Sequence, residues 1–261
     1  MHDKIDRLWW LSGLPLLLLF AIPILALVAR IQPLYFLENL VNPVVLQAVR
    51  ISFQTSAISM GLTLLLGTPI AYLIGKYQFP LKRLVDTIID LPTVLPPSVA
   101  GVALLITFGR RGLLGSTLGL WGIQIAFTQA AVVLAQMFIA APFYVRAAAI
   151  GFAGVDEEIQ QAAALDGANR WNTFRHVILP LSLNAILSGS VMAWARALGE
   201  FGATILFAGN YPGRTQTMPL AIYLGFESNL DIALVLSSIL ILFSFLALSL
   251  IKFLAPQPAG H

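Results

Sequence analysis

The side chains best suited to chemistry in this sequence are a few charged residues inside or beside long apolar runs. Arg196 and Glu200 are four residues apart, so on a helix they share one face and can form an ion pair. Because ionisable groups within a membrane span are costly, they commonly face a bundle interior or a pathway. The pair therefore indicates either a polar gate along a route for anions or an internal ion pair that locks helix packing.

A second candidate is the run Asp90-Leu-Pro-Thr-Val-Leu-Pro-Pro97. Pro92, Pro96 and Pro97 remove backbone donors and disfavour helix just before them, so an irregular entry into a helix is expected. Irregular backbone at membrane depth is tolerated where it faces protein or a watery cavity. Pro97 suits the first turn of a helix, whose free N–H groups favour an anion. The alternative is a packed helix entry capped by Asp90.

Three arginines are expected outside the membrane, Arg110 and Arg111 in one turn and Arg214 in another segment. They are candidates for docking a substrate-binding protein, with plain solvation as the alternative. No G-x-x-x-x-G-K-[ST] segment occurs, so the chain should not bind ATP through a Walker A loop. We expect it to hold no cofactor and to have no nucleic-acid partner.

Metal chemistry is not expected either. The sequence has no cysteine, which excludes disulfides and thiolate ligands. Its three histidines, His2, His176 and His261, lie far apart along the chain and do not suggest a metal site.

The composition indicates a membrane protein. Of 261 residues, 58% are hydrophobic and 10% are charged, and the mean hydropathy is +0.86. Soluble domains are typically about 45–50% apolar and about 25% charged. The chain therefore has too little polar surface to face water, and the lipid bilayer is the solvent that suits it.

Six apolar runs are of membrane-crossing length, which is about 20 residues. They cover roughly residues 8–29, 51–75, 91–108, 125–145, 181–207 and 232–251. Since backbone groups in lipid must be satisfied within the segment, each run should be a helix. A signal peptide competes for the first run, but that run is longer than a cleavable apolar region and no A-x-A site follows it.

The placement of Lys and Arg sets the expected orientation. If the N-terminus is cytosolic, the inside segments hold the larger set, Lys4, Arg7, Lys76, Lys82, Arg83, Arg146, Arg170, Arg175 and Lys252. The outside segments hold Arg30, Arg50, Arg110, Arg111 and Arg214. We therefore expect both termini in the cytoplasm.

The longest expected inside connection runs from Arg146 to Pro180. Asp156 can cap a helix there, and Glu157 and Glu158 suit the positive end of its dipole. Gly167 interrupts the pattern and predicts two short helices with a bend. An apolar stripe is expected on one side, formed by Ile159, Ala162, Ala163, Trp171 and Phe174. The small side chains among them would let a groove of another protein approach closely.

This connection resembles the E-A-A-x-x-x-G-x9-I-x-L-P motif of ABC importer permeases. The matching positions are Gln161, Ala162, Ala163, Gly167, Val177, Leu179 and Pro180. Gln161 replaces the Glu of the pattern and so loses a charge, and Val177 replaces the Ile. The resemblance implies that residues 156–180 form the cytoplasmic coupling helix, which docks into a cleft of the ATP-hydrolysing subunit. The alternative is an ordinary amphipathic surface helix.

Four further stretches are similar to the molybdate branch of these permeases, which lies near the sulfate permeases. They are residues 90–97, 108–112 (Phe-Gly-Arg-Arg-Gly), 195–203 (Ala-Arg-Ala-Leu-Gly-Glu-Phe-Gly-Ala) and 209–216 (Gly-Asn-Tyr-Pro-Gly-Arg-Thr-Gln). The resemblance covers a permease core of about residues 45–255 within a single transmembrane domain, 1–261. It implies an all-α, type I permease with six transmembrane helices in a prokaryotic cytoplasmic membrane.

The same resemblance implies function and partners. The expected function is import of molybdate or tungstate by alternating access. A pair of ABC ATPase subunits would bind ATP and Mg²⁺, a periplasmic or lipoprotein binding protein would deliver the anion, and a second copy of the permease would complete the pathway. The alternatives are a sulfate or thiosulfate permease and a secondary transporter driven by an ion gradient, which would show paired interrupted helices. An integral-membrane enzyme is a further alternative without a supporting cluster of His, Asp or Glu.

Overall fold

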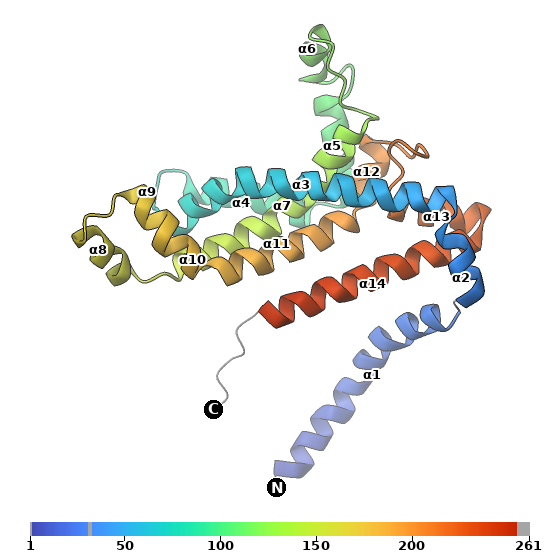
Figure 1. Ribbon diagram of the computed structural model, residues 1–261, viewed down its shortest axis with the longest axis horizontal. Helices are drawn as coiled ribbons and strands as arrows, with labels where there is room; N and C mark the ends of the chain where they lie inside the picture. Colours follow the sequence, from blue (N-terminus) through green and yellow to red (C-terminus); the bar gives the residue numbers. More distant parts are fainter. Residues whose placement is uncertain (1, 31–32, 255–261) are drawn as a thin grey trace.

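The computed structural model describes residues 2–30 and 33–254, and every element in these residues is a helix (Figure 1). In chain order the elements are α1 (His2–Ala29), α2 (Pro33–Leu40), α3 (Pro43–Lys76), α4 (Lys82–Val94), α5 (Pro97–Phe108), α6 (Gly115–Leu120), α7 (Gln129–Ala153), α8 (Glu157–Leu165), α9 (Arg170–Thr173), a π-helical turn (Phe174–Ile178), α10 (Leu179–Leu181), α11 (Leu183–Leu198), α12 (Gly202–Phe207), α13 (Met218–Ser228) and α14 (Leu230–Leu254). The predicted all-α class is confirmed.

Helices α3, α7 and α11 lie side by side and form the centre of the bundle (Figure 1). Their contact faces are rich in small residues, and a Cβ at Gly189 of α11 would lie 2.5 Å from the Cβ of Ala147 in α7. Small residues let apolar helices approach closely, which replaces the missing hydrophobic drive in lipid. Around this contact lies a buried cluster that includes Tyr144, Phe152 and Ile178.

Buried hydroxyl groups of α3 join the centre of the bundle to the later part of the chain. The Ser52 hydroxyl accepts a hydrogen bond from the Met218 backbone N–H at 2.7 Å, and the Ser56 hydroxyl accepts one from Trp194 Nε1 at 3.1 Å. These bonds connect α13 and α11 to α3 through buried polar side chains.

Helix α1 stands apart from the bundle (Figure 1). Its segment Trp9–Ala29 is long and apolar enough to cross a membrane, and none of the side chains in its most apolar stretch is buried. The segment is a continuous helix and is longer than the apolar region of a signal peptide. Its surface is open to lipid or to another protein chain.

Four helices are long and apolar enough to span a membrane by themselves, α1, α3, α7 and α14. Two bent pairs, α4 with α5 and the segment Arg170–Leu181 with α11, meet the same test together, at bends of 116° and 69°. The described residues therefore hold four candidate spans, or six if each bent pair counts as one.

The irregular entry expected at the prolines is present, but the expectation that this helical region begins near residue 91 is wrong. Helix α4 already begins at Lys82, runs along the bundle against α7, and ends at Val94, and α5 then turns away from it (Figure 1). The break falls at Leu95 and Pro96, whose ψ angles of 136° and 133° are extended. Because Pro96 and Pro97 have no N–H, they cannot continue the hydrogen bonds of α4.

The expected helix over residues 181–207 is also interrupted. Helix α11 ends at Leu198, and α12 begins again at Gly202 after a short turn that contains Glu200. At the other end, the long connection expected from Arg146 is shorter than predicted because α7 continues as helix to Ala153.

The two ends of the bundle carry different elements. Helices α8 and α9 lie at one end, and α2 and α13 lie at the other (Figure 1). The beginning of α1 and the end of α14 point in the same direction along the bundle. The last residues, 255–261, for which a cytoplasmic C-terminus was predicted, lie outside the described residues.

Candidate functional site

The segment between α7 and α11 projects from one end of the bundle as two short helices. Gly167 joins α8 to α9 with a φ of +85°, a conformation that residues with a side chain rarely adopt. The Ala168 N–H donates to the Ala163 carbonyl, and the Asn169 side chain caps α9 by accepting from the Asn172 N–H at 2.9 Å. The predicted bend between two helices at Gly167 is thus present.

Helix α8 contains no buried residue. Gln161 and Ala162 are exposed and Ala163 is half-buried. Larger apolar side chains beside them are also exposed, Leu165 by 90% and Trp171 by 64%. Glu157 and Glu158 occupy the first turn as expected, whereas Asp156 precedes the helix without a side-chain capping bond. An exposed apolar surface on a helix outside the bundle fits contact with another protein.

One hydrogen bond connects a residue just before α8 to the end of α3, and a second lies within the α8 segment. Lys76 Nζ donates to the Val155 carbonyl at 2.7 Å, and Gln160 Nε2 donates to the same carbonyl at 3.0 Å. A cavity of about 270 Å³ between α3 and α8 is lined in part by Tyr72, Glu157 and Gln161.

The last three motif residues lie apart from α8, at the entrance to α11. Val177 is in the π-helical turn, and Leu179 and Pro180 are in α10. The wide turn has a local cause, since Pro180 has no N–H that could donate to the His176 carbonyl as in an α-helix. The Leu179 N–H donates to the Phe174 carbonyl, five residues back, which makes the turn π-helical. Leu179 packs against the central cluster, which anchors this part of the segment to the bundle.

Arg196 and Glu200 form the predicted ion pair. Arg196 Nη1 lies 3.0 Å from Glu200 Oε2, and the other carboxylate oxygen accepts from the Ala203 backbone N–H at 2.8 Å. The Glu200 side chain is 1% exposed and the Arg196 side chain 33% exposed. The carboxylate therefore joins the end of α11 to the start of α12, and the Arg196 side chain remains partly exposed.

The Pro97 end of α5 meets this turn. A Cβ at Gly202 would lie 2.8 Å from the Cβ of Pro97, so only glycine allows the two helix starts to pack this closely. Pro96 precedes α5 and Pro97 lies in its first turn, as expected. Pro92, in contrast, lies inside α4 and lines an apolar cavity against α3 and α7. The structure thus packs Pro97 against the turn that contains Glu200, whereas Pro92 lies elsewhere, inside α4.

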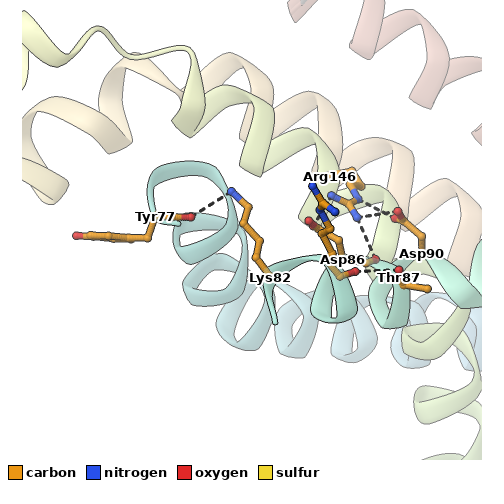
Figure 2. A network of polar contacts seen from close by, with 7 residues as sticks. Tyr77, Lys82, Asp86, Thr87, Asp90 and Arg146 are labelled. Atoms are coloured by element: carbon orange, nitrogen blue, oxygen red, sulfur yellow. Dashed lines mark hydrogen bonds and ion pairs between the residues drawn. The ribbon is translucent and has the colours of Figure 1, made fainter. Parts of the chain in front are cut away.

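Asp90 does not cap a helix and has a different partner. Figure 2 shows the Arg146 side chain of α7 between Asp86 and Asp90 of α4, with Nη1 to Asp86 Oδ1 at 2.8 Å and Nη2 to Asp90 Oδ2 at 2.7 Å. Arg146 also donates from Nε to Asp90 and from Nη2 to the Asp86 carbonyl. The network ties α4 to α7. Sequence reasoning missed Arg146 and Asp86, although Asp86 and Asp90 have the four-residue spacing of one helix face.

The three arginines expected outside lie in two different loops and are exposed. Arg110 and Arg111 follow α5, and Arg110 Nη2 lies 3.5 Å from Gln124 Oε1. Arg214 lies between α12 and α13, after Gly213. Within residues 2–30 and 33–254, no three His, Cys, Asp or Glu side chains gather as metal ligands, and His261 is outside this part of the chain.

Comparison with solved structures identifies the fold. A solved bacterial alginate ABC transporter, in complex with an alginate pentasaccharide-bound periplasmic protein, contains a chain that matches with a TM-score of 0.73. The match covers 97% of this chain and 95% of that chain at 19% sequence identity, so the two share the fold.

The chain belongs to the family of binding-protein-dependent transport system inner membrane components, which matches residues 67–259. It is therefore a transport permease subunit rather than a catalytic enzyme. It is 42% identical to the molybdenum transport system permease protein ModB of Mycobacterium bovis over 92% of both chains. It is 45% identical to the ModB of Escherichia coli K12 over 68% of this chain and 78% of that protein.

Proposed function

We propose that this chain is the membrane subunit of an ATP-driven importer of molybdate. The observation that carries the proposal is the 42% identity to a molybdenum permease over 92% of both chains, joined to a family that describes transport permeases. An oxyanion substrate also agrees with the electrostatics of the membrane part, where Arg196 is neutralised by Glu200. A permanently free arginine in a conduit would hold a dianion too strongly.

Helix α8 is the proposed docking element for the ATP-hydrolysing subunit. Its support is geometric, since Gln161, Ala162 and Leu165 stand exposed at the end of the bundle. The small side chains allow a groove to reach the helix backbone, and Leu165 offers an apolar anchor. Because Lys76 bonds to Val155 beside α8, movement of the docked subunit would be passed to α3.

The proposed assembly contains two permease copies, two ATPase subunits and one binding protein. A periplasmic protein bound to the related alginate transporter supports the last of these. Arg110, Arg111 and Arg214 are the proposed contacts for the binding protein, since all three are exposed. Arg196, Glu200, Pro96 and Pro97 are proposed to line or gate the pathway, at the point where α5 meets α12. Asp90 and Pro92 are proposed to act there indirectly, through the packing of α4.

The proposed topology places both termini and α8 in the cytoplasm. It is supported by the larger share of Lys and Arg in the segments assigned to the inside. The counting of each bent pair as one span gives the six crossings that this topology needs.

The proposal is tested in cells that lack their own molybdate importer. Expression of this chain with its ATPase and binding-protein partners should restore a molybdenum-dependent enzyme activity at low external molybdate. The matched control carries an ATPase partner that cannot hydrolyse ATP. If activity is restored equally with that control, transport does not depend on ATP and a secondary carrier is the better account. If the cells gain sulfate uptake instead, the substrate assignment is wrong.

A further inference from the structure

A polar cavity of about 370 Å³ lies near the end of the bundle that carries α2 and α13. It is lined by side chains from the beginning of α3, by the first residue of α7, and by the loop before α13. The lining residues are Gln47, Arg50, Ile51, Gln54, Gln129 and Gly213. Neither the coupling segment nor the Arg196–Glu200 pair contributes to it.

The chemistry of the lining favours an anion. One guanidinium and three carboxamides can each donate hydrogen bonds, and the lining contains no carboxylate. Arg146 and Arg196 are each paired with a carboxylate, and Arg50 differs from them in this pairing. In the described residues Arg50 has no ion pair. A planar guanidinium that is free to donate matches the oxygen atoms of an oxyanion.

One wall of the cavity is held rigidly. Gly213 has a φ of +71°, and a Cβ at this position would lie 3.1 Å from Gln47 Oε1. The Tyr211 carbonyl accepts hydrogen bonds from the N–H groups of Arg214, Thr215 and Gln216, and the last two residues are buried. The loop therefore presents its glycine to Gln47 in one fixed shape, so little ordering is required when a ligand binds.

The position of the cavity across the membrane suits a ligand that enters from water. Helix α3 has 34 residues, and at about 1.5 Å per residue Arg50 lies ~39 Å from Lys76 along the helix. The hydrocarbon core is about 30 Å thick. With Lys76 at the cytoplasmic boundary, Arg50 lies ~9 Å beyond the core on the outer side, where a guanidinium meets water.

We propose that this cavity, with Arg50 as its cation, is an outer subsite that receives the tetrahedral oxyanion after its release from the binding protein. The proposal rests on the proposed function. It gives a role in that function to residues that neither the motif nor the comparisons identify. Unlike an arginine inside the conduit, Arg50 is exposed to water, which screens its charge, so the site binds the anion weakly and lets it move on. Such a site recognises charge and oxygen atoms, so molybdate and sulfate should both occupy it.

The absence of cysteine from the sequence allows a direct test. A Gln54→Cys variant places one thiol in the cavity, and its reaction with a negatively charged methanethiosulfonate reagent is followed in the complete transporter in lipid vesicles. Millimolar molybdate, at constant ionic strength, should slow this reaction. Adding Arg50→Gln should raise the molybdate concentration that halves the reaction rate by about tenfold, as expected for the loss of one charge-assisted hydrogen bond.

Two controls separate a site from a general charge effect. Arg30→Gln removes an exposed arginine expected on the same side of the membrane and should leave the protection unchanged. A thiol at exposed Ser116 should react at a rate that molybdate does not alter. If molybdate fails to protect residue 54 in vesicles that import it, the subsite is refuted while the proposed function stands. If Arg50→Gln weakens only the attachment of the binding protein, the cavity is a docking contact and the subsite is likewise refuted.

Discussion

Removal of the Arg196 side chain should destabilise the protein more than removal of the Glu200 charge. Truncating one partner of a buried ion pair costs about 3–5 kcal/mol because the other charge stays buried and uncompensated. Glu200 is the buried partner at 1% exposure, whereas Arg196 is 33% exposed and keeps access to solvent. The remaining hydrogen bond from the Ala203 N–H stabilises the carboxylate in part. We therefore expect Arg196→Met to cost about 2–3 kcal/mol.

The partner substitutions should be milder. Glu200→Gln keeps an oxygen that can accept from Ala203 and leaves a half-exposed arginine, so we expect a cost of about 1 kcal/mol. The double variant, Arg196→Met with Glu200→Gln, removes both charges and should be more stable than Arg196→Met alone. The free energy of unfolding in mixed detergent micelles measures all three, with Lys252→Ala at the exposed end of α14 as the control.

The refuting result is specific. If Arg196→Met and the double variant unfold at the same free energy, the buried carboxylate was not compensated by Arg196. If Glu200→Gln is the most damaging change, the carboxylate charge stabilises the turn through a group other than Arg196, and the ion pair does not hold α11 to α12.

Three further predictions concern the segment around α8 and the contact between α4 and α7. A cysteine introduced at Asp156 should react with an impermeant reagent from the cytoplasmic side only, and reaction from the outside would invert the topology. Gly167→Leu should insert normally and yet lose the ATPase subunit in co-purification, since a φ of +85° costs about 1–2 kcal/mol for a branched residue. The control variants Gly167→Asn and Gln161→Glu should retain the ATPase subunit. Retention by Gly167→Leu would exclude α8 as the coupling helix. Arg146→Gln should lower the thermal stability by freeing α4 from α7, and an unchanged melting temperature would show that the carboxylates of Figure 2 are satisfied by water.

Much of the fold could be predicted from the sequence because lipid imposes a simple rule. Long uncharged runs must be helices, and this rule found the regions of α1, α3, α7 and α14. Local chemistry was equally informative at Gly167, where a glycine between two helical patterns marks a positive φ. The pairing of Arg196 with Glu200 followed from their spacing alone.

The errors arose where long-range contacts decide the geometry. The sequence placed Asp90 at a helix entry, but Arg146, 56 residues away, engages it in the middle of α4. The prolines at 92 and 96 look alike in sequence, yet α4 accommodates Pro92 and ends before Pro96. Similarly, Arg146 suggested the start of a loop, but it lies inside α7. The helix continues past it because Arg146 is paired with Asp86 and Asp90 of α4.

The central claim is that this permease imports molybdate with energy from ATP. The most direct measurement is the initial rate of molybdate uptake into proteoliposomes that contain this chain with its ATPase subunits, with loaded binding protein outside and ATP inside. The account predicts uptake that requires hydrolysable ATP, persists when ionophores collapse the ion gradients, and is faster for molybdate than for sulfate. Uptake that continues without ATP, or that is lost when the ion gradients collapse, would contradict it.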